Sequence, residues 1–318
     1  MPVKSIYPIY REDSYVSFNS YKSFKRLAPQ DITFVQDPRE ADLKIVFEAV
    51  DNGITRTLGL KRLMDTKLVA IAEGDRFNFP LLPGLYVSIS KSYANPKRSY
   101  SHAYWSYLAE TDGNPFCKGY VETEKKYLCC FTGKSNIPLR SRIFSTLKNE
   151  SNYFLKDTMH TYRHFDGRRD INEQETYVRL IRESEFSICP RGKGASSIRL
   201  FESMRLGTAP IIIGDTWTAP LGPDWESFSF RVKESEINTI PNLIKANRHR
   251  HMEMGLLARR AYETHFSKQT IVSDSLKQLE AFSNHRSFER SLRVRRYLFH
   301  SIIYYLRQLN ARLKESFR

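Results

Sequence analysis

A glycine-rich loop with two cations lies between two apolar segments in the second half of the chain. The loop, PRGKGASS at 190–197, directly follows the mostly apolar run 186–189. Glycines permit tight turns, and serine commonly caps the N-terminus of a helix. Such a terminus favours negatively charged ligands, because backbone N–H groups and the helix dipole point outward there. The loop therefore predicts an anion-binding site with four candidate residues: Arg191, Gly192, Ser196 and Ser197.

The segment after the loop has the pattern of a helix and then a strand. Apolar residues recur every three positions from 198 to 204, while Arg199 and Glu202 share another face. Gly207 predicts the end of the helix, and the isoleucine run 211–213 predicts a strand. Together these elements form a strand–helix–strand unit of a parallel sheet. Its loop lies at the carboxyl end of the sheet, where open α/β folds bind nucleotides.

Arg199 and Glu202 allow two interpretations. Their spacing alone favours a surface ion pair, which would stabilise the fold by only about 0.3 to 0.5 kcal/mol. The glycine loop before them and the strand after them favour ligand contacts instead. An arginine there would stabilise a diphosphate, and a carboxylate would accept hydrogen bonds from the two hydroxyls of a ribose.

The order of these motifs resembles the exostosin family, glycosyltransferase family 47. The resemblance covers roughly Cys129 to Ile237, and the chain would be a short, microbial-type member. It consists of a strand–glycine segment followed by arginines, a strand ending in Cys-Pro, Ser-x-Arg-x-x-Glu, Gly-x-x-Pro and an aspartate after the next strand. The residues that carry it are Gly133, Arg140, Arg142, Cys189, Pro190, Ser197, Arg199, Glu202, Gly207, Pro210 and Asp215.

The resemblance implies a GT-B fold, in which two Rossmann-like α/β domains face each other across a cleft. The acceptor would bind the first domain and a nucleotide sugar, mostly linked to uridine diphosphate in this family, would bind the second. The reaction would be an inverting glycosyl transfer to a glycan or lipid-linked glycan. The implied donor-site residues are Gly133, Arg140, Arg142, Arg191, Gly192, Ser196, Ser197, Arg199, Glu202 and Asp215.

An inverting transfer needs a base that removes the proton of the acceptor hydroxyl. Glu73 and Asp75 are the candidates, because they directly follow a predicted strand in the first domain. The alternative is that they only cap or turn the chain. The sequence contains no Asp-x-Asp motif, so we expect no metal and no cofactor beyond the nucleotide sugar as co-substrate.

We predict three regions: an acceptor-side α/β domain at 1–126, a nucleotide-sugar-binding α/β domain at 127–285 and a basic helical tail at 286–318. In the first domain we predict strands at 3–9, 32–35, 43–47, 68–72 and 85–89, and helices at 20–27 and 54–64. In the second we predict a capping box from Asn172 to Glu175, an alternating strand at 227–232 and helices from 234 to 282.

The tail holds nine Lys or Arg against two Glu, and nine minus two gives +7 of the chain's +15. Interleaved with aromatic and aliphatic residues, residues 287–318 suit an anionic membrane surface. The alternative is a pair of helices that pack on the domains. No apolar run approaches the ~18 residues of a membrane span, and the first residues lack a signal-peptide core. We therefore expect a cytoplasmic enzyme of surface polysaccharide or glycolipid synthesis, and a membrane-binding tail would hold it at the inner face of the membrane.

Four cysteines show no metal-like spacing, and adjacent Cys129 and Cys130 would point to opposite faces of a strand. We interpret all four as reduced core residues. Two other functions stay open: a polyanion-binding protein that uses the tail, and a glycan-binding module without catalysis. Nucleic acid is disfavoured as the polyanion, because no nucleic-acid motif is present and the basic excess lies in a tail.

Overall fold

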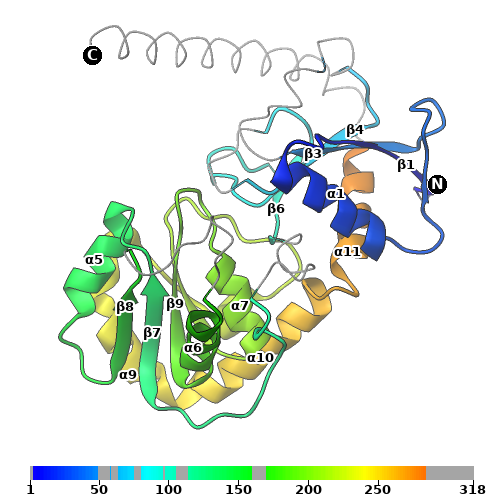
Figure 1. Ribbon diagram of the computed structural model, residues 1–318. Helices are drawn as coiled ribbons and strands as arrows, with labels where there is room; N and C mark the ends of the chain where they lie inside the picture. The colour runs from blue at the N-terminus through cyan, green and yellow to red at the C-terminus, as the bar shows by residue number, and fades with distance from the viewer. Residues whose placement is uncertain are drawn as a thin grey trace, which may run out of the picture.

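The computed structural model describes residues 3–48, 58, 64–74, 80–95, 97–104, 114–159 and 170–283. These residues form two α/β domains, each built on a parallel sheet (Figure 1). This confirms the predicted fold class. Asp75, the tail at 286–318 and most of the helix predicted at 54–64 lie outside the described residues.

The first sheet has six strands in the order β2-β1-β3-β4-β5-β6, and all of its pairings are parallel. Its strands are β1 Ser5–Ile9, β2 Thr33–Phe34, β3 Leu43–Glu48, β4 Leu68–Ala72, β5 Gly84–Tyr86 and β6 Ser99–Ser101. The helix α1, Tyr15–Leu27, packs on β3. All five predicted strands are present, but the one predicted at 85–89 is the shorter β5, which ends at Tyr86. The short polar strand β6 was not predicted, because it lacks an apolar run and forms only by pairing with β5.

The second sheet has five strands in the order β11-β10-β9-β7-β8, again all parallel. Its strands are β7 Tyr127–Gly133, β8 Tyr153–Asp157, β9 Ser184–Pro190, β10 Ala209–Ile213 and β11 Phe230–Val232. The helices are α5 Pro138–Leu147, α6 Ile171–Arg182, α7 Ile198–Leu206, α8 Trp225–Phe228, α9 Ile240–Asn247, α10 His251–His265 and α11 Ile271–Ser283, with 3-10 turns at Glu234–Thr239 and Arg248–Arg250.

The centre of the second sheet is the predicted strand–helix–strand unit. Every residue of β9 and β10 is buried, which explains the continuous apolar sequence of β10. β9 also buries the polar residues Ser184, Glu185 and Ser187. The helix between them, α7, ends at Gly207, whose φ of 75° is the left-handed conformation that glycine adopts without strain. This unit is confirmed from its first strand to its last.

The cysteines confirm the predicted packing of β7. Cys129 and Cys130 belong to different apolar clusters, so they point to opposite faces of the sheet. All four cysteines are buried and carry free thiols. Burial raises the pKa of the Cys189 thiol to about 12, so this group stays protonated and unreactive at neutral pH.

Two local predictions in the second domain are wrong. Asp170 caps α6, accepting hydrogen bonds from the N–H groups of Asn172 and Glu173, so Asn172 lies inside the helix. The strand predicted at 227–232 is a helical turn, α8, followed by the shorter β11. Trp225 begins that turn and packs against Trp217 and Phe228, so aromatic burial outweighs the alternating pattern.

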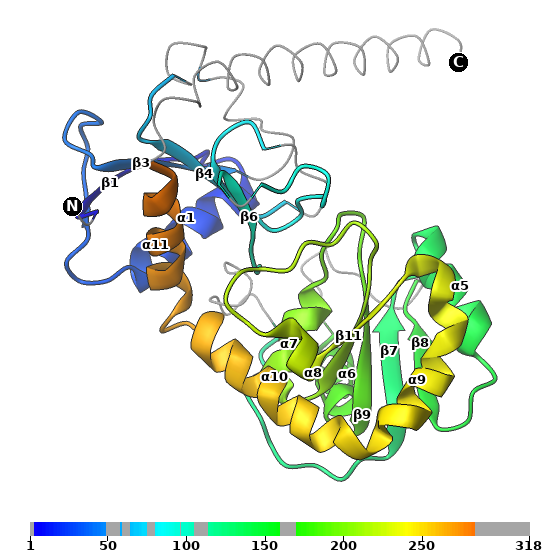
Figure 2. The same ribbon diagram turned by 180° about the vertical axis from the view of Figure 1, so that it is seen from behind.

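The last described helix returns to the first domain. α10 runs along the second domain, and α11 then packs on β4 and β5 of the first sheet (Figure 2). His102, which follows β6, lies 3.0 Å from the Ser275 hydroxyl of α11 through its Nε2 atom. Burial lowers the pKa of His102 to about 4, so the imidazole is neutral at pH 7. The predicted boundary at 285 gave α11 to the second domain, whereas the structure packs it on the first.

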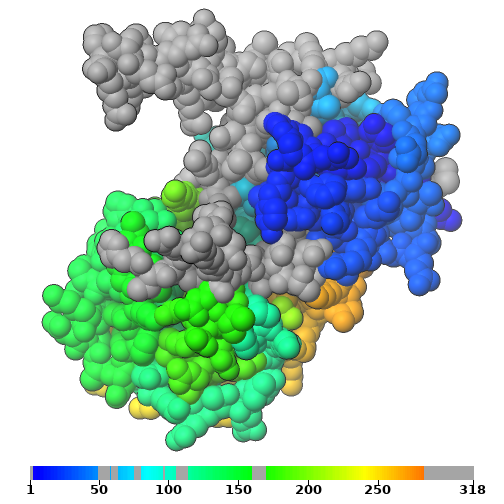
Figure 3. All heavy atoms as spheres, viewed as in Figure 1, coloured from blue at the N-terminus to red at the C-terminus, as the bar shows by residue number. Residues whose placement is uncertain are grey.

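In the space-filling view the first domain is the blue lobe and the second the green lobe, with orange α11 below the blue one (Figure 3). One large apolar cluster nevertheless contains residues of both. It joins Ile45 and Val69 of the first sheet to Leu279 of α11, and Phe201 of α7 to Phe266. The domains are therefore connected through their cores as well as through the chain.

Candidate functional site

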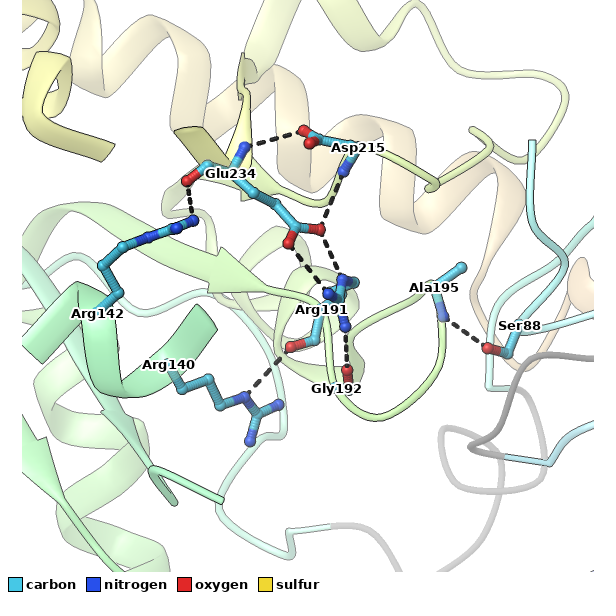
Figure 4. Close-up of polar contacts among 8 residues, drawn as sticks. All are labelled: Ser88, Arg140, Arg142, Arg191, Gly192, Ala195, Asp215 and Glu234. Atoms are coloured by element: carbon cyan, nitrogen blue, oxygen red, sulfur yellow. Dashed lines mark hydrogen bonds and ion pairs between the residues drawn. The ribbon is translucent and has the colours of Figure 1, made fainter. Parts of the chain in front are cut away.

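Four segments that follow strands of the second sheet meet at its carboxyl edge (Figure 4). Arg140 lies in the first turn of α5, after β7, and Arg191 directly follows β9. Asp215 follows β10, and Glu234 follows β11. Carboxyl ends of parallel strands share one edge, so the topology brings together residues that are distant in sequence.

Arg191 and Glu234 form the centre of this edge. Arg191 Nε and Nη2 donate to the two Glu234 carboxylate oxygens at 2.6 and 3.0 Å, a bidentate ion pair. Glu234 Oε1 also accepts from the Asp215 N–H at 3.3 Å, and the Asp215 carboxylate accepts from the Glu234 N–H at 2.9 Å. Partial burial works to raise the pKa of Glu234, but the Arg191 hydrogen bonds hold it below its ordinary value. The Glu234 carboxylate is therefore charged at neutral pH.

The two arginines of α5 approach this pair from different directions. Arg140 Nε donates to the Arg191 carbonyl at 3.2 Å, and Arg142 donates to the Glu234 carbonyl. Gly192 lies beside this guanidinium, since a Cβ atom there would be in ordinary contact with Arg140 Nη2 at 3.6 Å. Gly133, the last residue of β7, also lies beside Arg140. Both arginines thus belong to the cluster, Arg140 on the side of the glycine loop.

The glycine loop closes on itself before α7 begins. The Gly192 N–H donates to the Ser196 carbonyl at 3.1 Å. Ser197 occupies the N-cap position of α7, but its side chain makes no capping hydrogen bond. The Ser196 hydroxyl is buried and has no hydrogen-bond partner within the described part of the chain. The first turn of α7 has no acidic residue. No carboxylate of that turn therefore competes with an anionic ligand for the positive end of the helix dipole.

Arg199 and Glu202 are buried, with 8% and 3% of their surfaces exposed, so they are not a surface ion pair. The Arg199 guanidinium lies over two aromatic rings, 5.2 Å from the Phe131 centroid and 4.6 Å from that of Tyr177. Its Nη1 atom is buried and makes no hydrogen bond to the residues that the structure describes. Desolvation works to lower the pKa of Arg199, but Tyr177 and other neighbours hold it above its ordinary value. The site thus keeps a permanent cation with a donor atom to spare.

Glu202 lies one turn after Arg199 on α7. It accepts a hydrogen bond from the Tyr177 hydroxyl of α6, with 2.5 Å between the oxygen atoms. Neither Tyr177 nor Glu234 was singled out from the sequence as a site residue.

The carboxyl edge of the first sheet carries two buried carboxylates on neighbouring strands. Glu48 ends β3 and is 2% exposed, and Glu73 follows β4 and is 6% exposed. The Glu73 N–H donates to the Glu48 carbonyl at 3.2 Å. Glu73 was predicted and Glu48 was not, although its place at the end of an apolar strand was a usable signal. Asp75 lies outside the described residues.

Two hydrogen bonds join the loops of the two domains near the site. The Ala195 N–H of the glycine loop donates to the Ser88 hydroxyl, which follows β5, at 2.7 Å (Figure 4). The Lys91 N–H donates to the Thr216 carbonyl, after β10, at 2.9 Å. The carboxyl edges of the two sheets therefore face each other. Ser88 carried no local sequence signal, because its partner lies 107 positions away.

The described residues contain no group of three or more His, Cys, Asp or Glu side chains that could hold a metal ion. Among those same residues, no helix is both long enough and apolar enough to cross a membrane.

Several known proteins are similar to this chain. An exostosin-1 homolog of Caenorhabditis elegans is 27% identical over 169 residues, which are 48% of this chain and 44% of that protein. Exostosin-1 of Drosophila melanogaster is 24% identical over 136 residues, 38% of this chain and 18% of that protein. The chain therefore spans less than half the length of these relatives.

Among solved structures, MurG of Acinetobacter baumannii aligns with a TM-score of 0.42 and 12% identity, covering 87% of this chain and 99% of MurG. A glycosyltransferase of Rickettsia africae aligns with a TM-score of 0.43 and 10% identity, covering 88% and 99%. The family model described as the exostosin GT47 domain matches residues 82–246, more than half of the chain, and includes the glycine loop, α7 and β7 to β11. The chain belongs to the exostosin GT47 family.

Proposed function

We propose that this chain is an inverting glycosyltransferase. It transfers a hexose or pentose from a nucleotide diphosphate sugar, linked to uridine diphosphate, to a glycan or lipid-linked glycan. The observation that carries the proposal is the buried Arg199, whose spare donor lies in the first turn of a helix that begins at the glycine loop. Membership of the exostosin GT47 family supports the same reaction class.

The cations of the second domain stabilise the leaving group. As the glycosidic bond breaks, negative charge builds up on the leaving diphosphate. Donors fixed in advance at that place stabilise the transition state more than the ground state. Arg140 and Arg199 supply the charge, together with the N–H groups at the start of α7. Arg191 acts differently, because its guanidinium is already paired with Glu234 and shapes the loop.

The carboxylates of the second domain recognise the nucleotide and the sugar. Glu202 accepts hydrogen bonds from the ribose hydroxyls, and Asp215 lies at the strand end where the donor sugar would sit. A metal is not required in this scheme, since the cluster of arginines supplies positive charge to the diphosphate.

The base comes from the first domain. Glu73 lies at the carboxyl edge that faces the second domain, and it deprotonates the acceptor hydroxyl as that oxygen attacks the anomeric carbon. Glu48, on the neighbouring strand, and Asp75 are the alternatives.

The basic tail locates the enzyme at a membrane. Residues 287–318 bind an anionic membrane surface at its cytoplasmic face, where a lipid-linked acceptor of polysaccharide or glycolipid synthesis resides. Deletion of this segment should abolish binding to vesicles that contain phosphatidylglycerol. Unchanged vesicle binding would mean that the tail has another role.

The donor half is tested by thermal unfolding of the wild type and Arg199→Ala with the diphosphates of uridine, guanosine, cytidine and thymidine, with and without a divalent metal. A ligand at about 100 times its dissociation constant stabilises the fold by about 2.7 kcal/mol. Uridine diphosphate alone should raise the Tm of the wild type without metal, whereas Arg199→Ala should show no ligand-induced rise. If no nucleotide raises the wild-type Tm, the transferase proposal fails.

A further inference from the structure

We propose that Tyr177 is a positioning residue of the donor site, one that fixes both the Arg199 guanidinium and the Glu202 carboxylate. The inference rests on the proposed function, in which these two side chains bind the diphosphate and the ribose. Tyr177 lies on α6, and its two partners lie on α7, the helix packed beside it (Figure 1).

The tyrosine ring orients the arginine. The Arg199 guanidinium has the Tyr177 ring at 4.6 Å and the Phe131 ring at 5.2 Å, and both interactions are cation–π contacts. A planar guanidinium held by its faces presents its N–H groups at its edges. The buried Nη1 atom, which has no hydrogen bond to the described residues, lies on one of those edges. The two rings therefore restrain the guanidinium that would meet an anion.

The tyrosine hydroxyl orients the carboxylate. It donates to Glu202 Oε2 at 2.5 Å, a short hydrogen bond that restrains the position of the carboxylate. A carboxylate has two oxygens and about four lone-pair sites, so a bond to Oε2 leaves it able to accept others. One side chain thus holds the two ligand-binding groups at a fixed separation, and phenylalanine could hold only the arginine.

This division can be tested with two variants and two probes. Tyr177→Phe keeps the ring and removes the bond to Glu202, whereas Tyr177→Leu removes both contacts. We would measure the Kd of uridine diphosphate and of 2′-deoxyuridine diphosphate for the full chain by calorimetry. Tyr177→Phe should raise the Kd of uridine diphosphate about tenfold, in line with the loss of a charge-assisted hydrogen bond. It should raise the Kd of the 2′-deoxy probe by a smaller factor. Tyr177→Leu should weaken both probes.

Tyr262→Phe is the matched control. Tyr262 is also buried, and it faces the guanidinium groups of Arg205 and Arg259 at 5.8 and 6.0 Å, but it lies on α10 near the other end of α7. Its substitution should leave both Kd values unchanged.

The outcomes separate the two proposals. If Tyr177→Phe binds both probes as the wild type does, or weakens both by the same factor, the positioning role is overturned while the transferase proposal stands. If the wild type binds neither probe, both proposals fail together.

Discussion

The two carboxyl edges of the molecule differ in chemistry. The edge of the second sheet carries a network of ion pairs and hydrogen bonds among Arg140, Arg191, Asp215 and Glu234. The edge of the first sheet carries two buried carboxylates, Glu48 and Glu73, and is joined to the other domain through hydrogen bonds. In the proposed reaction this difference corresponds to a division of labour: the second edge would stabilise negative charge and the first would accept a proton.

The charge network of the second edge is held by reciprocal contacts. Glu234 and Asp215 bind each other through backbone N–H groups in both directions, so the loops after β10 and β11 have a fixed spacing. The second edge is therefore preorganised before any ligand arrives, which is what electrostatic stabilisation of a transition state requires.

The largest effect should come from the base. Glu73→Gln keeps the shape of the side chain and removes its basicity, so kcat should fall by about 10²- to 10⁴-fold while the Kd of uridine diphosphate stays unchanged. Steady-state kinetics beside calorimetry would measure this. Glu48→Gln is the control on the neighbouring strand and should retain most activity. The opposite pattern would identify Glu48 as the base, and full activity of both variants would indicate Asp75.

The second largest effect should come from removing Arg140, the arginine on the side of the glycine loop. Arg140→Ala removes a fixed cation beside the glycine loop, so kcat should fall about 10²- to 10³-fold, the usual cost of losing one preorganised donor. Arg142→Ala is the control, because Arg142 donates to the Glu234 carbonyl and should cost less than about tenfold. Equal losses in the two variants would contradict a special role for the loop-facing side chain.

Breaking the central ion pair should destabilise the fold moderately. Glu234→Gln should lower the free energy of unfolding by about 1 to 2 kcal/mol at pH 7, since the pair is bidentate and partly buried. The folded-state pKa of Glu234 lies below its ordinary value of 4.5, so the ionised carboxylate stabilises the fold above that pH. Its contribution is lost as the pH falls through the lowered pKa. Urea unfolding at pH 7 and at pH 3 should therefore show the two proteins converging in acid; a constant difference would rule this out.

The smallest effect should come from the interdomain hydrogen bond. Ser88→Ala removes the acceptor of the Ala195 N–H, which should cost about 0.5 to 1.5 kcal/mol of unfolding free energy and raise the KM for the donor severalfold. Ser90→Ala is matched, because the Ser90 hydroxyl contacts Ser92 within its own loop. Identical kinetics of the two variants would mean that Ser88 does not hold the glycine loop in place.

Much of the fold could be predicted because its signals are local. The apolar runs gave the five strands of the first sheet, and the spacing from 198 to 207 gave α7 with its terminating glycine. The three-residue β6 could not be predicted, since its residues are polar and only pairing with β5 makes them a strand. The cap of α6 was misplaced by two residues, because the Asp170 side chain already caps the N–H groups of Asn172 and Glu173 and the helix begins before Asn172.

The sequence by itself determined the two α/β domains, the glycine loop and the carboxyl edge at which Arg140, Arg191 and Asp215 meet, because each follows from residues within one strand–loop–helix segment. Only the tertiary structure decided which of these groups are paired and which keep donors. Arg191 meets Glu234 across 43 positions, Glu202 meets Tyr177 across 25, and Ala195 meets Ser88 across 107. Such pairings depend on how strands are ordered and how domains pack, and side-chain chemistry read along the chain does not encode them locally.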